Sequence, residues 1–595
     1  MADYEKQALL DSRAHVDGRR DTTLKMLAPR RPAWLVWMLR LVAIFVLLKW
    51  PIDAIYNALD CSSKHEIRYA GERVAWTPCG NVAGRDLECS SIAVPLDHFN
   101  ASNNAGGKHF TIPLVRMRGK NATHNLLLNP GGPGGSGAEF IHRRGAQLSE
   151  IVGEGIHLLS FDPRGINGSK PSASCYPDDD ARRNIPKPEP PRNAITDSGE
   201  LWAWAAGYAR ACTDTMGEYG PHINTPQTAA DMNDILDALG QEDMYYWGFS
   251  YGTLLGQTYA TLFPERSKRV IIDGVVNQFD WYGESGQDES MVDTDSVYAG
   301  FVDECVKAGP EACALASHAE TKGQLSQKLI SSVQKLRDDP LSVYINSTKY
   351  GIVDYTDVWY RGVFSSLYKP NLWQGLAHNL ASLLSGNATG AFLDYGWEDY
   401  KDQTNMEEAN HFVELNDDLA GPEHWPQDRA SLLDAIAPVL NHSMFTESDL
   451  ESLFLRATWT VPRRHSFVPS HHVKTAHPLL VLSSAHDPIT PLASAKVANA
   501  VFEGSRLVKV DGYGHCSIAV PSVCLARHVR AFLFEGKLPD QNEHCEVDGN
   551  PYFGETEGTG SKTVRPLKHF DSPEERAIHL AQVQLARDLW FRPRL

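Results

Sequence analysis

The chain has 595 residues and a formal net charge of -18 at pH 7. This length exceeds one ordinary domain and supplies enough apolar area for a buried core without a disulfide or metal scaffold. The negative charge, and the lack of a Lys/Arg stripe interleaved with aromatic residues in the body of the chain, argue against nucleic acid as a partner. A cationic substrate would also suit the acidic balance, but we interpret it as a solubility feature.

Ten cysteines and six N-x-S/T sequons point to an oxidising, glycosylating compartment. The sequons all lie beyond residue 60, at Asn100, Asn121, Asn167, Asn346, Asn387 and Asn441. Four cysteine pairs are close in sequence and lack C-x-x-C spacing: Cys79 with Cys89, Cys175 with Cys212, Cys305 with Cys313, and Cys516 with Cys524. Cys61 and Cys545 are left over. A disulfide between these two cysteines is one option, and the sequence leaves the connectivity open.

The first predicted element is a membrane anchor over residues 33–50, AWLVWMLRLVAIFVLLKW. A helix of this length spans about 27 Å, close to the hydrocarbon thickness. Arg40 opposes insertion by about 2.5 to 3.5 kcal/mol and the apolar residues favour it by about 3 to 6, so insertion is marginally favoured. Basic residues before the run predict a cytosolic tail over residues 1–32 and a lumenal or extracellular remainder. The alternatives are a cleaved signal peptide with secretion, and a buried helix.

Alternating strands and helices are predicted over residues 60–276, the first part of the core. Apolar runs that end in turn residues predict strands over residues 89–99, 109–118, 156–161 and 269–276, and a further strand just before Ser250. Helical spacing predicts a helix over residues 228–239, and another from Ser250 to about Phe263. This alternation indicates the α/β class, with a mostly parallel, doubly wound sheet.

The pattern stops over residues 277–476, where helical periodicity, Trp, Tyr and loops predict an inserted helical lid. It resumes over residues 477–545, the predicted C-terminal part of the core, with two further strands separated by a helix. The tail over residues 546–595 contains a capping box from Ser572 to Glu575, followed by an amphipathic helix through Leu589.

Ser250 stands between two glycines in GFSYGT, directly after the aromatic strand. G-x-S-x-G alone is a weak signal, because Gly and Ser are common. A nucleophile on a sharp strand-to-helix turn, however, needs small residues two positions before and after it, as Gly248 and Gly252 are. We therefore predict that Ser250 is a nucleophile.

Asp487 and His515 follow two later strands. In a parallel α/β sheet, functional residues lie on loops at the carboxyl ends of strands, and the order Ser, Asp, His is the one expected with a nucleophile elbow. His515 would accept the serine proton as general base, and Asp487 would hold the imidazole tautomer. Taken singly, Asp487 is also typical of an Asp-Pro turn and His515 of a loop histidine, but their joint placement favours a catalytic triad.

The loop over residues 130–137, PGGPGGSG, allows close approach of the backbone to a substrate. The N–H groups of Gly132 and Tyr251 are the predicted donors of an oxyanion hole. A phosphate-binding loop is excluded, because there is no G-K-[ST] ending and no G-x-G-x-x-G with a following helix and ribose acid.

Four histidines gather around the end of the predicted lid, at His465, His471, His472 and His477. They lack the spacing of a helical H-E-x-x-H or of a zinc finger. We interpret this stretch as a solvated loop and expect no metal and no cofactor.

Six motifs in chain order resemble one family: VPLDHF, NPGGPGGSG, FDPRGINGS, GFSYGT, HDPITP and DGYGHCS. They are similar to the tripeptidyl-aminopeptidase-like, prolyl-aminopeptidase-related serine peptidases of the α/β-hydrolase superfamily, which are common in actinomycetes and fungi. The resemblance covers about residues 75 to 550. It implies an α/β-hydrolase fold, the triad Ser250, Asp487 and His515, and the oxyanion donors Gly132 and Tyr251.

The predicted lid departs from this family. The tripeptidyl branch usually has a cysteine ahead of x-x-W and a partner in an earlier C-x-D stretch, whereas here Arg456 precedes Trp459 and Leu415 precedes Asp417. Both cysteines are missing together, which is consistent with the loss of one disulfide. Lids of this family set specificity, so we expect the divergent lid to influence which substrates the enzyme accepts.

Two functions are compatible with this core: a membrane-anchored serine exopeptidase of the aminopeptidase or tripeptidyl aminopeptidase type, and an esterase or other acyl hydrolase acting on a small molecule. An inactive binding protein is disfavoured, because every triad position is filled. An exopeptidase needs an acid for the free α-ammonium group of its substrate. Glu414, Asp417 and Asp418 in FVELNDD are the candidates, with surface acids as the alternative for each.

Overall fold

A computed structural model of the chain describes residues 66–188, 193–283, 289–396, 405–554 and 570–588. The predicted anchor over residues 33–50, Cys61 and Leu589 lie outside these ranges. Within them, no helix combines the length and the apolar character needed to cross a membrane.

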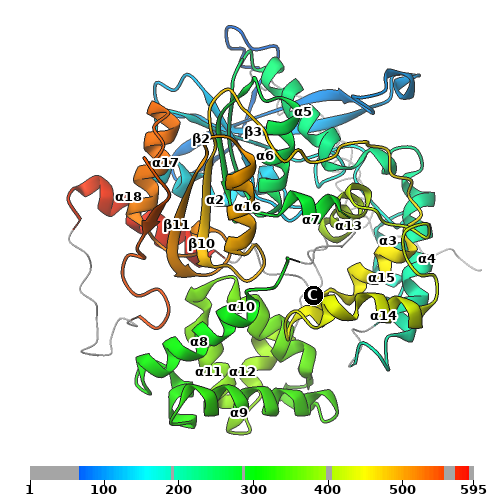
Figure 1. Cartoon of the computed structure of the whole chain (residues 1–595), viewed down its shortest axis with the longest axis vertical. Coiled ribbons are helices and arrows are strands. Elements are labelled where there is room, and N and C mark those ends of the chain that lie inside the picture. The colour runs from blue at the N-terminus through cyan, green and yellow to red at the C-terminus, as the bar shows by residue number, and fades with distance from the viewer. Residues whose placement is uncertain (1–65, 189–192, 284–288, 397–404, 555–569, 589–595) are drawn as a thin grey trace, which may run out of the picture. The chain divides into compact units, whose positions relative to one another are not determined.

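A ten-stranded sheet runs through the described residues in the order β1-β2-β3-β5-β4-β6-β7-β10-β11-β12 (Figure 1). Neighbours from β1 to β5 pair antiparallel, and neighbours from β5 to β12 pair parallel. The strands are β1 Thr77–Val82, β2 Arg85–Pro95, β3 His109–Met117, β4 Asn125–Asn129, β5 His157–Phe161, β6 Met244–Phe249, β7 Ser267–Asp273, β10 Leu480–His486, β11 Arg506–Tyr513 and β12 Glu543–Cys545. The predicted α/β class and mostly parallel sheet are confirmed. The edge strands β1 and β12 were not predicted.

Helices cover both faces of the sheet, so its central strands are continuous apolar runs. Every residue of β4 and β6 is buried. Tyr246 belongs to the core cluster of one face, whereas Trp247 belongs to the cluster of the other, as the two-residue period of a strand requires. The first cluster includes α5 Thr225–Ala238, α6 Tyr251–Leu262 and α16 Leu492–Val501, and the second includes α2 Gly137–Val152, α17 Val523–Glu535 and α18 Pro573–Arg587.

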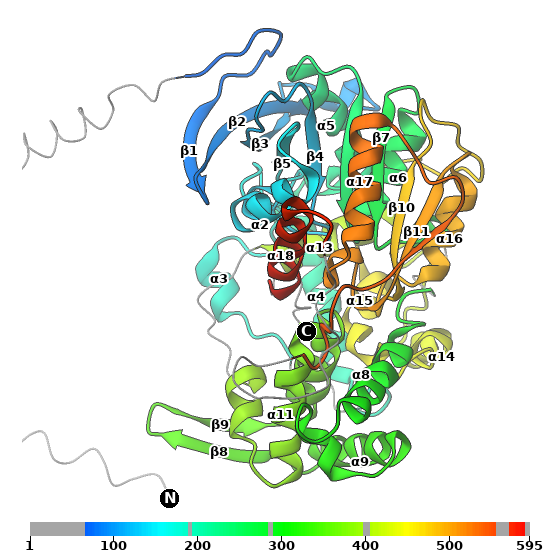
Figure 2. The same cartoon turned by 90° about the vertical axis from the view of Figure 1, so that its left-hand side faces the viewer.

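Between β7 and β10 the chain forms two groups of elements (Figures 1 and 2). The first group has a hydrophobic cluster of its own and contains α8 Thr294–Ala308, α9 Lys322–Gln334, β8 Leu341–Asn346, β9 Lys349–Val353, α10 Ser365–Leu367, α11 Trp373–Leu384 and α12 Thr389–Ala391. The second group packs with α4 Gly199–Met216 and the sheet in one cluster, and contains α13 Met406–Asp417, α14 Arg429–Leu440 and α15 Leu450–Thr458. The hairpin β8–β9 was not predicted, because its short strands lie within a long helical pattern.

Four disulfides form within the described residues: Cys79–Cys89, Cys175–Cys212, Cys305–Cys313 and Cys524–Cys545. The predicted pair Cys516 with Cys524 is wrong, and so is the option that Cys545 pairs with Cys61. β12 lies beside β11 and brings Cys545 to Cys524 in α17, whereas Cys516 is a buried free thiol behind the end of β11. The prediction was wrong because it relied on distance along the chain, whereas the fold brings Cys545, which is farther along the chain, next to Cys524 in space.

The C-terminal helix α18 packs against α2. Ser572 caps it by accepting a hydrogen bond from the Glu575 N–H. Arg143 and Arg144 of α2 form ion pairs with Asp588, just beyond the last turn of α18. This part of the tail is therefore fastened to the core.

Candidate active site

Ser250 lies at the turn from β6 into α6 and has φ +55° and ψ -126°. A positive φ is uncommon for a non-glycine residue and is strained. The backbone N–H of Ser250 donates to the Asp273 carbonyl at 3.0 Å, which fastens the turn to the end of β7. The geometry is that of a nucleophile elbow.

Steric limits at this turn explain the two flanking glycines. A Cβ on Gly248 would lie 2.2 Å from the carbonyl oxygen of Gly252, and a Cβ on Gly252 would lie 2.8 Å from the carbonyl oxygen of Asn129. Both distances are below the closest approach of real Cβ atoms. The small residues that the sequence predicts at these positions are thus required by backbone atoms.

Asp487 and His515 meet at the ends of β10 and β11. His515 Nδ1 lies 3.0 Å from Asp487 Oδ1 and 3.1 Å from Oδ2, and Thr490 Oγ1 lies 3.3 Å from the same nitrogen. Both side chains are almost fully buried. This contact leaves Nε2 as the ring nitrogen that can serve a substrate or nucleophile.

Asp487 is held in its ionised form. Burial raises the pKa of its carboxyl group, but the charge and hydrogen bond of His515 and the N–H groups of Thr490 and Cys516 together outweigh burial and lower the pKa. The Cys516 N–H donates to Oδ2 at 2.8 Å, and the N–H groups of Ile489 and Thr490 donate to Oδ1. A charged acceptor is therefore in place for the imidazole N–H.

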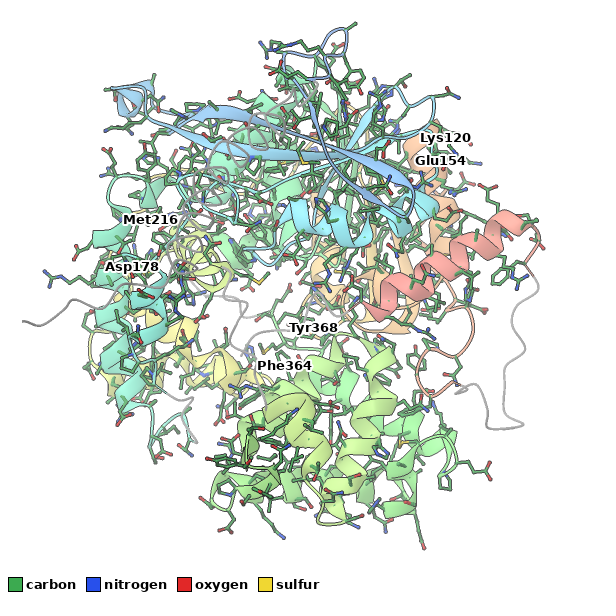
Figure 3. All side chains as sticks on the ribbon, turned by 180° about the vertical axis from the view of Figure 1, so that it is seen from behind. Lys120, Glu154, Asp178, Met216, Phe364 and Tyr368 are labelled. Carbon is green, nitrogen blue, oxygen red and sulfur yellow. A yellow bond between two sulfur atoms is a disulfide. The ribbon has the colours of Figure 1, made fainter. Side chains whose placement is uncertain are left out.

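The insertion contributes to the position of His515. The His515 N–H donates to the Tyr368 carbonyl at 3.0 Å, and the two rings meet edge to face at 5.1 Å. Tyr368 directly follows α10, and Figure 3 shows it with Phe364 at the end of the first group nearest to the sheet. Sequence reasoning did not find this contact, because residues far apart in the chain make it.

Asp273 supports the segment that follows His515. Its carboxylate accepts the Ser517 N–H at 2.7 Å and the Ser517 hydroxyl at 2.6 Å. Burial raises the pKa of Asp273 to about 6. The sequence offered one signal for this residue, an acid at the end of an apolar strand.

The glycine-rich loop after β4 lies against the start of α6. A Cβ on Gly131 would be 2.9 Å from Ser250 Cβ and 3.1 Å from the Tyr251 nitrogen. Gly132 follows directly, and Tyr251 is the first residue of α6, where backbone N–H groups lack helical acceptors. Met406 of α13 packs over the loop, since a Cβ on Gly134 would meet its carbonyl oxygen at 2.5 Å.

Asp417, predicted to contact substrate, instead binds protein groups. Its Oδ1 accepts the Thr225 N–H, and its Oδ2 accepts the Thr225 hydroxyl at 2.5 Å and Trp281 Nε1 at 3.0 Å. The Thr225 hydroxyl also lies 2.6 Å from the Tyr251 hydroxyl. Asp417 thus anchors the side chain of Tyr251 through Thr225. Burial raises the pKa of Asp417 to about 7.

Glu414 and Asp418 both pair with Arg456. Glu414 Oε1 lies 2.9 Å from one terminal nitrogen of Arg456, and Asp418 Oδ2 lies 2.8 Å from the other. Asp418, which the sequence analysis offers as a substrate contact, is buried, and its Oδ1 also accepts the Leu419 N–H at 2.6 Å. A buried ion triad links the end of α13 to α15, in the region where the tripeptidyl branch of the family usually has the two cysteines that this chain lacks.

The four clustered histidines have separate surroundings. His465 Nε2 lies 3.1 Å from the carbonyl oxygens of Asn416 and Asp417, His471 stacks on Phe279, His472 pairs with Glu503, and His477 packs against Phe532.

Comparisons with known proteins agree with this architecture. A family described as alpha/beta hydrolase fold matches residues 125–298, and a family described as TAP-like protein matches residues 443–545. Serine protease Hip1 of Mycobacterium tuberculosis is 29% identical over 500 residues, 80% of this chain and 91% of the relative. Tripeptidyl aminopeptidase of Streptomyces lividans is 26% identical over 512 residues, 81% of this chain and 88% of the relative. The chain is a serine hydrolase that is similar to TAP-like proteins. Carboxylesterase B of Mycobacterium tuberculosis is 26% identical over 476 residues, 78% of this chain and 86% of the relative.

Each of the two family matches contains part of the candidate active site. The α/β-hydrolase match contains the glycine-rich loop and Ser250, and the TAP-like match contains Asp487 and His515. The predicted resemblance and the predicted serine hydrolase activity are therefore confirmed.

Proposed function

We propose that the protein is a serine exopeptidase in which Ser250, His515 and Asp487 form the triad. The observation that carries this proposal is the pairing of a buried His515–Asp487 contact with a strained serine turn at the same edge of the sheet. Ser250 Oγ attacks the substrate carbonyl carbon while His515 accepts its proton. The N–H groups of Gly132 and Tyr251 stabilise the oxyanion.

His515 then returns the proton to the leaving amine, and an acyl-enzyme remains on Ser250. A water molecule, deprotonated by His515, hydrolyses this ester and frees the serine. Asp487 stays ionised throughout and stabilises the imidazolium, as its lowered pKa supports.

Substitution Ser250→Ala tests the nucleophile. Hydrolysis should fall by on the order of 10⁴-fold or more, because neither the triad nor the acyl-enzyme can operate. Folding should be retained, as judged by circular dichroism and thermal unfolding. Activity that persists in this variant on any ester or peptide substrate would eliminate Ser250 as nucleophile.

The elements over residues 277–476 act as a lid in this proposal. Contacts on three sides support it: Tyr368 touches His515, Met406 touches the glycine-rich loop, and Thr294 donates to the Pro488 carbonyl beside Asp487. A roofed site admits one chain end rather than a continuous strand of protein.

Asp449, the residue before α15, is the acid proposed to bind the free α-ammonium group, because Glu414 beside it is already paired with Arg456. The pKa of Asp449 is raised to about 7 by burial and by Glu414, so the two carboxyl groups are close and an added cation would be favoured. The carboxylates of Asp487 and Asp449 both contribute, after burial, to the raised pKa of Tyr368, which supports a position of Asp449 near the triad. The names of two relatives, serine protease and tripeptidyl aminopeptidase, favour a peptide substrate.

Reporters with a free or acetylated amine test this assignment. A tripeptidyl reporter should lose about 1.5 to 3 kcal/mol of transition-state binding on N-acetylation, the value of one charged hydrogen bond. Asp449→Asn should reduce that difference, whereas Asp434→Asn, an exposed acid of α14, should leave it unchanged. Equal rates on both reporters would argue against the exopeptidase.

An esterase acting on a small molecule is the second candidate. The similarity to Carboxylesterase B favours it, and the same triad and oxyanion hole would serve. Faster turnover of a neutral ester than of either peptide reporter would establish this alternative.

The proposed location is a single-pass membrane anchor over residues 33–50 with the enzyme on the lumenal or extracellular side. The sequence pattern supports this, with a secreted form after signal cleavage as the alternative. Retention in the pellet after an alkaline wash, with glycosidase-sensitive mobility, is expected. A soluble form that begins near Asp60 would support cleavage instead.

A further inference from the structure

The hairpin β8–β9 exposes aromatic side chains that lack a protein cover. Tyr344 is 72% exposed, Tyr350 is 63% exposed and Ile352 is 56% exposed. Tyr344 and Tyr350 are directly opposite in the register, and their ring centroids are 6.5 Å apart. Exposed apolar patches of this kind usually mark a surface that something covers.

The turn of the same hairpin contains a sequon, Asn346-Ser347-Thr348. Asn346 stands two residues after Tyr344, about 7 Å along the strand. The register is irregular between these two residues, and such bulges redirect a side chain. A sugar ring on Asn346 would therefore lie within reach of the tyrosine pair.

The side chain of Asn346 is oriented so that its amide nitrogen is available for glycosyl transfer. Its Oδ1 accepts the Thr348 N–H at 2.9 Å and the Thr348 hydroxyl at 2.8 Å. In the described part of the chain no protein group accepts a hydrogen bond from its Nδ2. Asn167 is the contrast, because its Nδ2 donates to Ser136 and Asp162 in the active-site region and a glycan there would replace one of the two N–H groups that make these bonds.

We propose that Asn346 carries an N-linked glycan whose first N-acetylglucosamine packs on Tyr344 and Tyr350. Transfer forms a bond from Asn346 Nδ2 to C1 of the sugar and breaks the C1–oxygen bond of a lipid-linked oligosaccharide. The lipid diphosphate leaves, and the amide proton goes to solvent. The C–H groups on the flat face of the sugar then cover the aromatic rings, which stabilises the exposed face of the hairpin in addition to the packing of Val343 and Val353 in the cluster beneath it.

The exposed tyrosine pair is better suited to cover by a carbohydrate than to contact with a lipid surface. A hydrated glycan in the turn would hold the tyrosines away from a bilayer. Lys349 pairs with Asn346 in the register, so the turn is polar even before modification.

The experiment uses the full chain expressed in a yeast secretory pathway. Peptide N-glycosidase in ¹⁸O-labelled water should convert Asn346 to labelled aspartate, which establishes occupancy. One sample is then trimmed by endoglycosidase H to a single sugar, and another is stripped completely. Amide hydrogen exchange over residues 341–353 should be about 5-fold slower with the single sugar, the size expected of one aromatic packing contact.

The Tyr344→Thr variant separates packing from mere occupancy. The glycan should still be present in it, but the difference between trimmed and stripped samples should vanish. Asn387, an exposed sequon preceded by Ser385 rather than by an aromatic residue, is the matched control, and exchange around it should not respond to Tyr344→Thr. The proposal would be overturned if Asn346 were unmodified, or if the single sugar slowed hydrogen exchange equally in the native chain and in Tyr344→Thr. Binding of phosphatidylcholine vesicles through the native glycosylated hairpin would also overturn it.

Discussion

Gly248 shows how one backbone position determines the nucleophile turn. Its missing side chain leaves room for the Gly252 carbonyl, which also accepts the Tyr246 hydroxyl at 2.7 Å. Gly248→Ala should therefore lower the free energy of unfolding by on the order of 3 kcal/mol and remove most activity, because the turn must shift. Urea unfolding and reporter turnover measure the two effects.

Gly375→Ala is the matched control for that substitution. Gly375 lies inside α11 with no atom within 4 Å of an added Cβ. Alanine there should stabilise the protein by up to about 1 kcal/mol with unchanged turnover. A harmless Gly248→Ala would contradict the steric account of the turn.

His157 gives the clearest pH dependence at a single residue. Its Nδ1 accepts the Gly119 N–H, and burial, followed by the charges of Arg116 and Arg118, lowers its pKa to about 4. An unfolded histidine titrates near 6.5, so between pH 7 and 5 the unfolded chain gains a proton that the folded chain does not, and stability falls. The contribution over this interval is about 2 kcal/mol.

His157→Asn tests this, because the amide oxygen can replace Nδ1 as acceptor without titrating. Unfolding in urea at pH 7 and pH 5 should show a loss of stability that is smaller by about 2 kcal/mol in the variant. Identical losses in both proteins would show that His157 is not held neutral.

At the scale of elements, α13 and α15 are joined by a buried ion triad. Arg456→Met should destabilise the protein by about 3 to 5 kcal/mol, because Glu414 and Asp418 would be buried without a counter-charge. Thermal and urea unfolding would measure the loss.

The triple variant Arg456→Met, Glu414→Gln, Asp418→Asn is its control. It should regain much of the lost stability, because no buried charge is left unpaired. If the triple variant were as unstable as the single one, packing of the arginine stem rather than charge would carry the contact.

At the scale of the whole molecule, Cys524–Cys545 fastens the edge strand β12 to helix α17. The bond closes a separation of 21 residues, so Cys545→Ser should lower the free energy of unfolding by about 3 kcal/mol. Cys516→Ala should leave every disulfide intact, because that thiol is free and buried. A peptide map under non-reducing conditions that linked Cys516 to Cys524 would contradict this connectivity.

The sequence by itself determined the β/α order of the core and the residues that follow its central strands. Apolar runs, Gly-x-Ser-x-Gly and the order Ser, Asp, His are local patterns, and the parallel sheet brings such strand ends to one edge. Asp487 and His515 could be named for that reason, and they do meet.

Only the tertiary structure decided the partners of side chains from distant segments. Tyr368 reaches His515 from the insertion, Asp417 binds Thr225, and Arg456 binds Glu414 and Asp418. The stretch FVELNDD does not predict these contacts, because its sequence alone does not distinguish an acidic residue that binds other protein groups from one that binds substrate. Cys545 likewise reaches Cys524 only because β12 pairs with β11. Packing between elements selects one partner among many, and that selection depends on three-dimensional distance rather than on spacing along the chain.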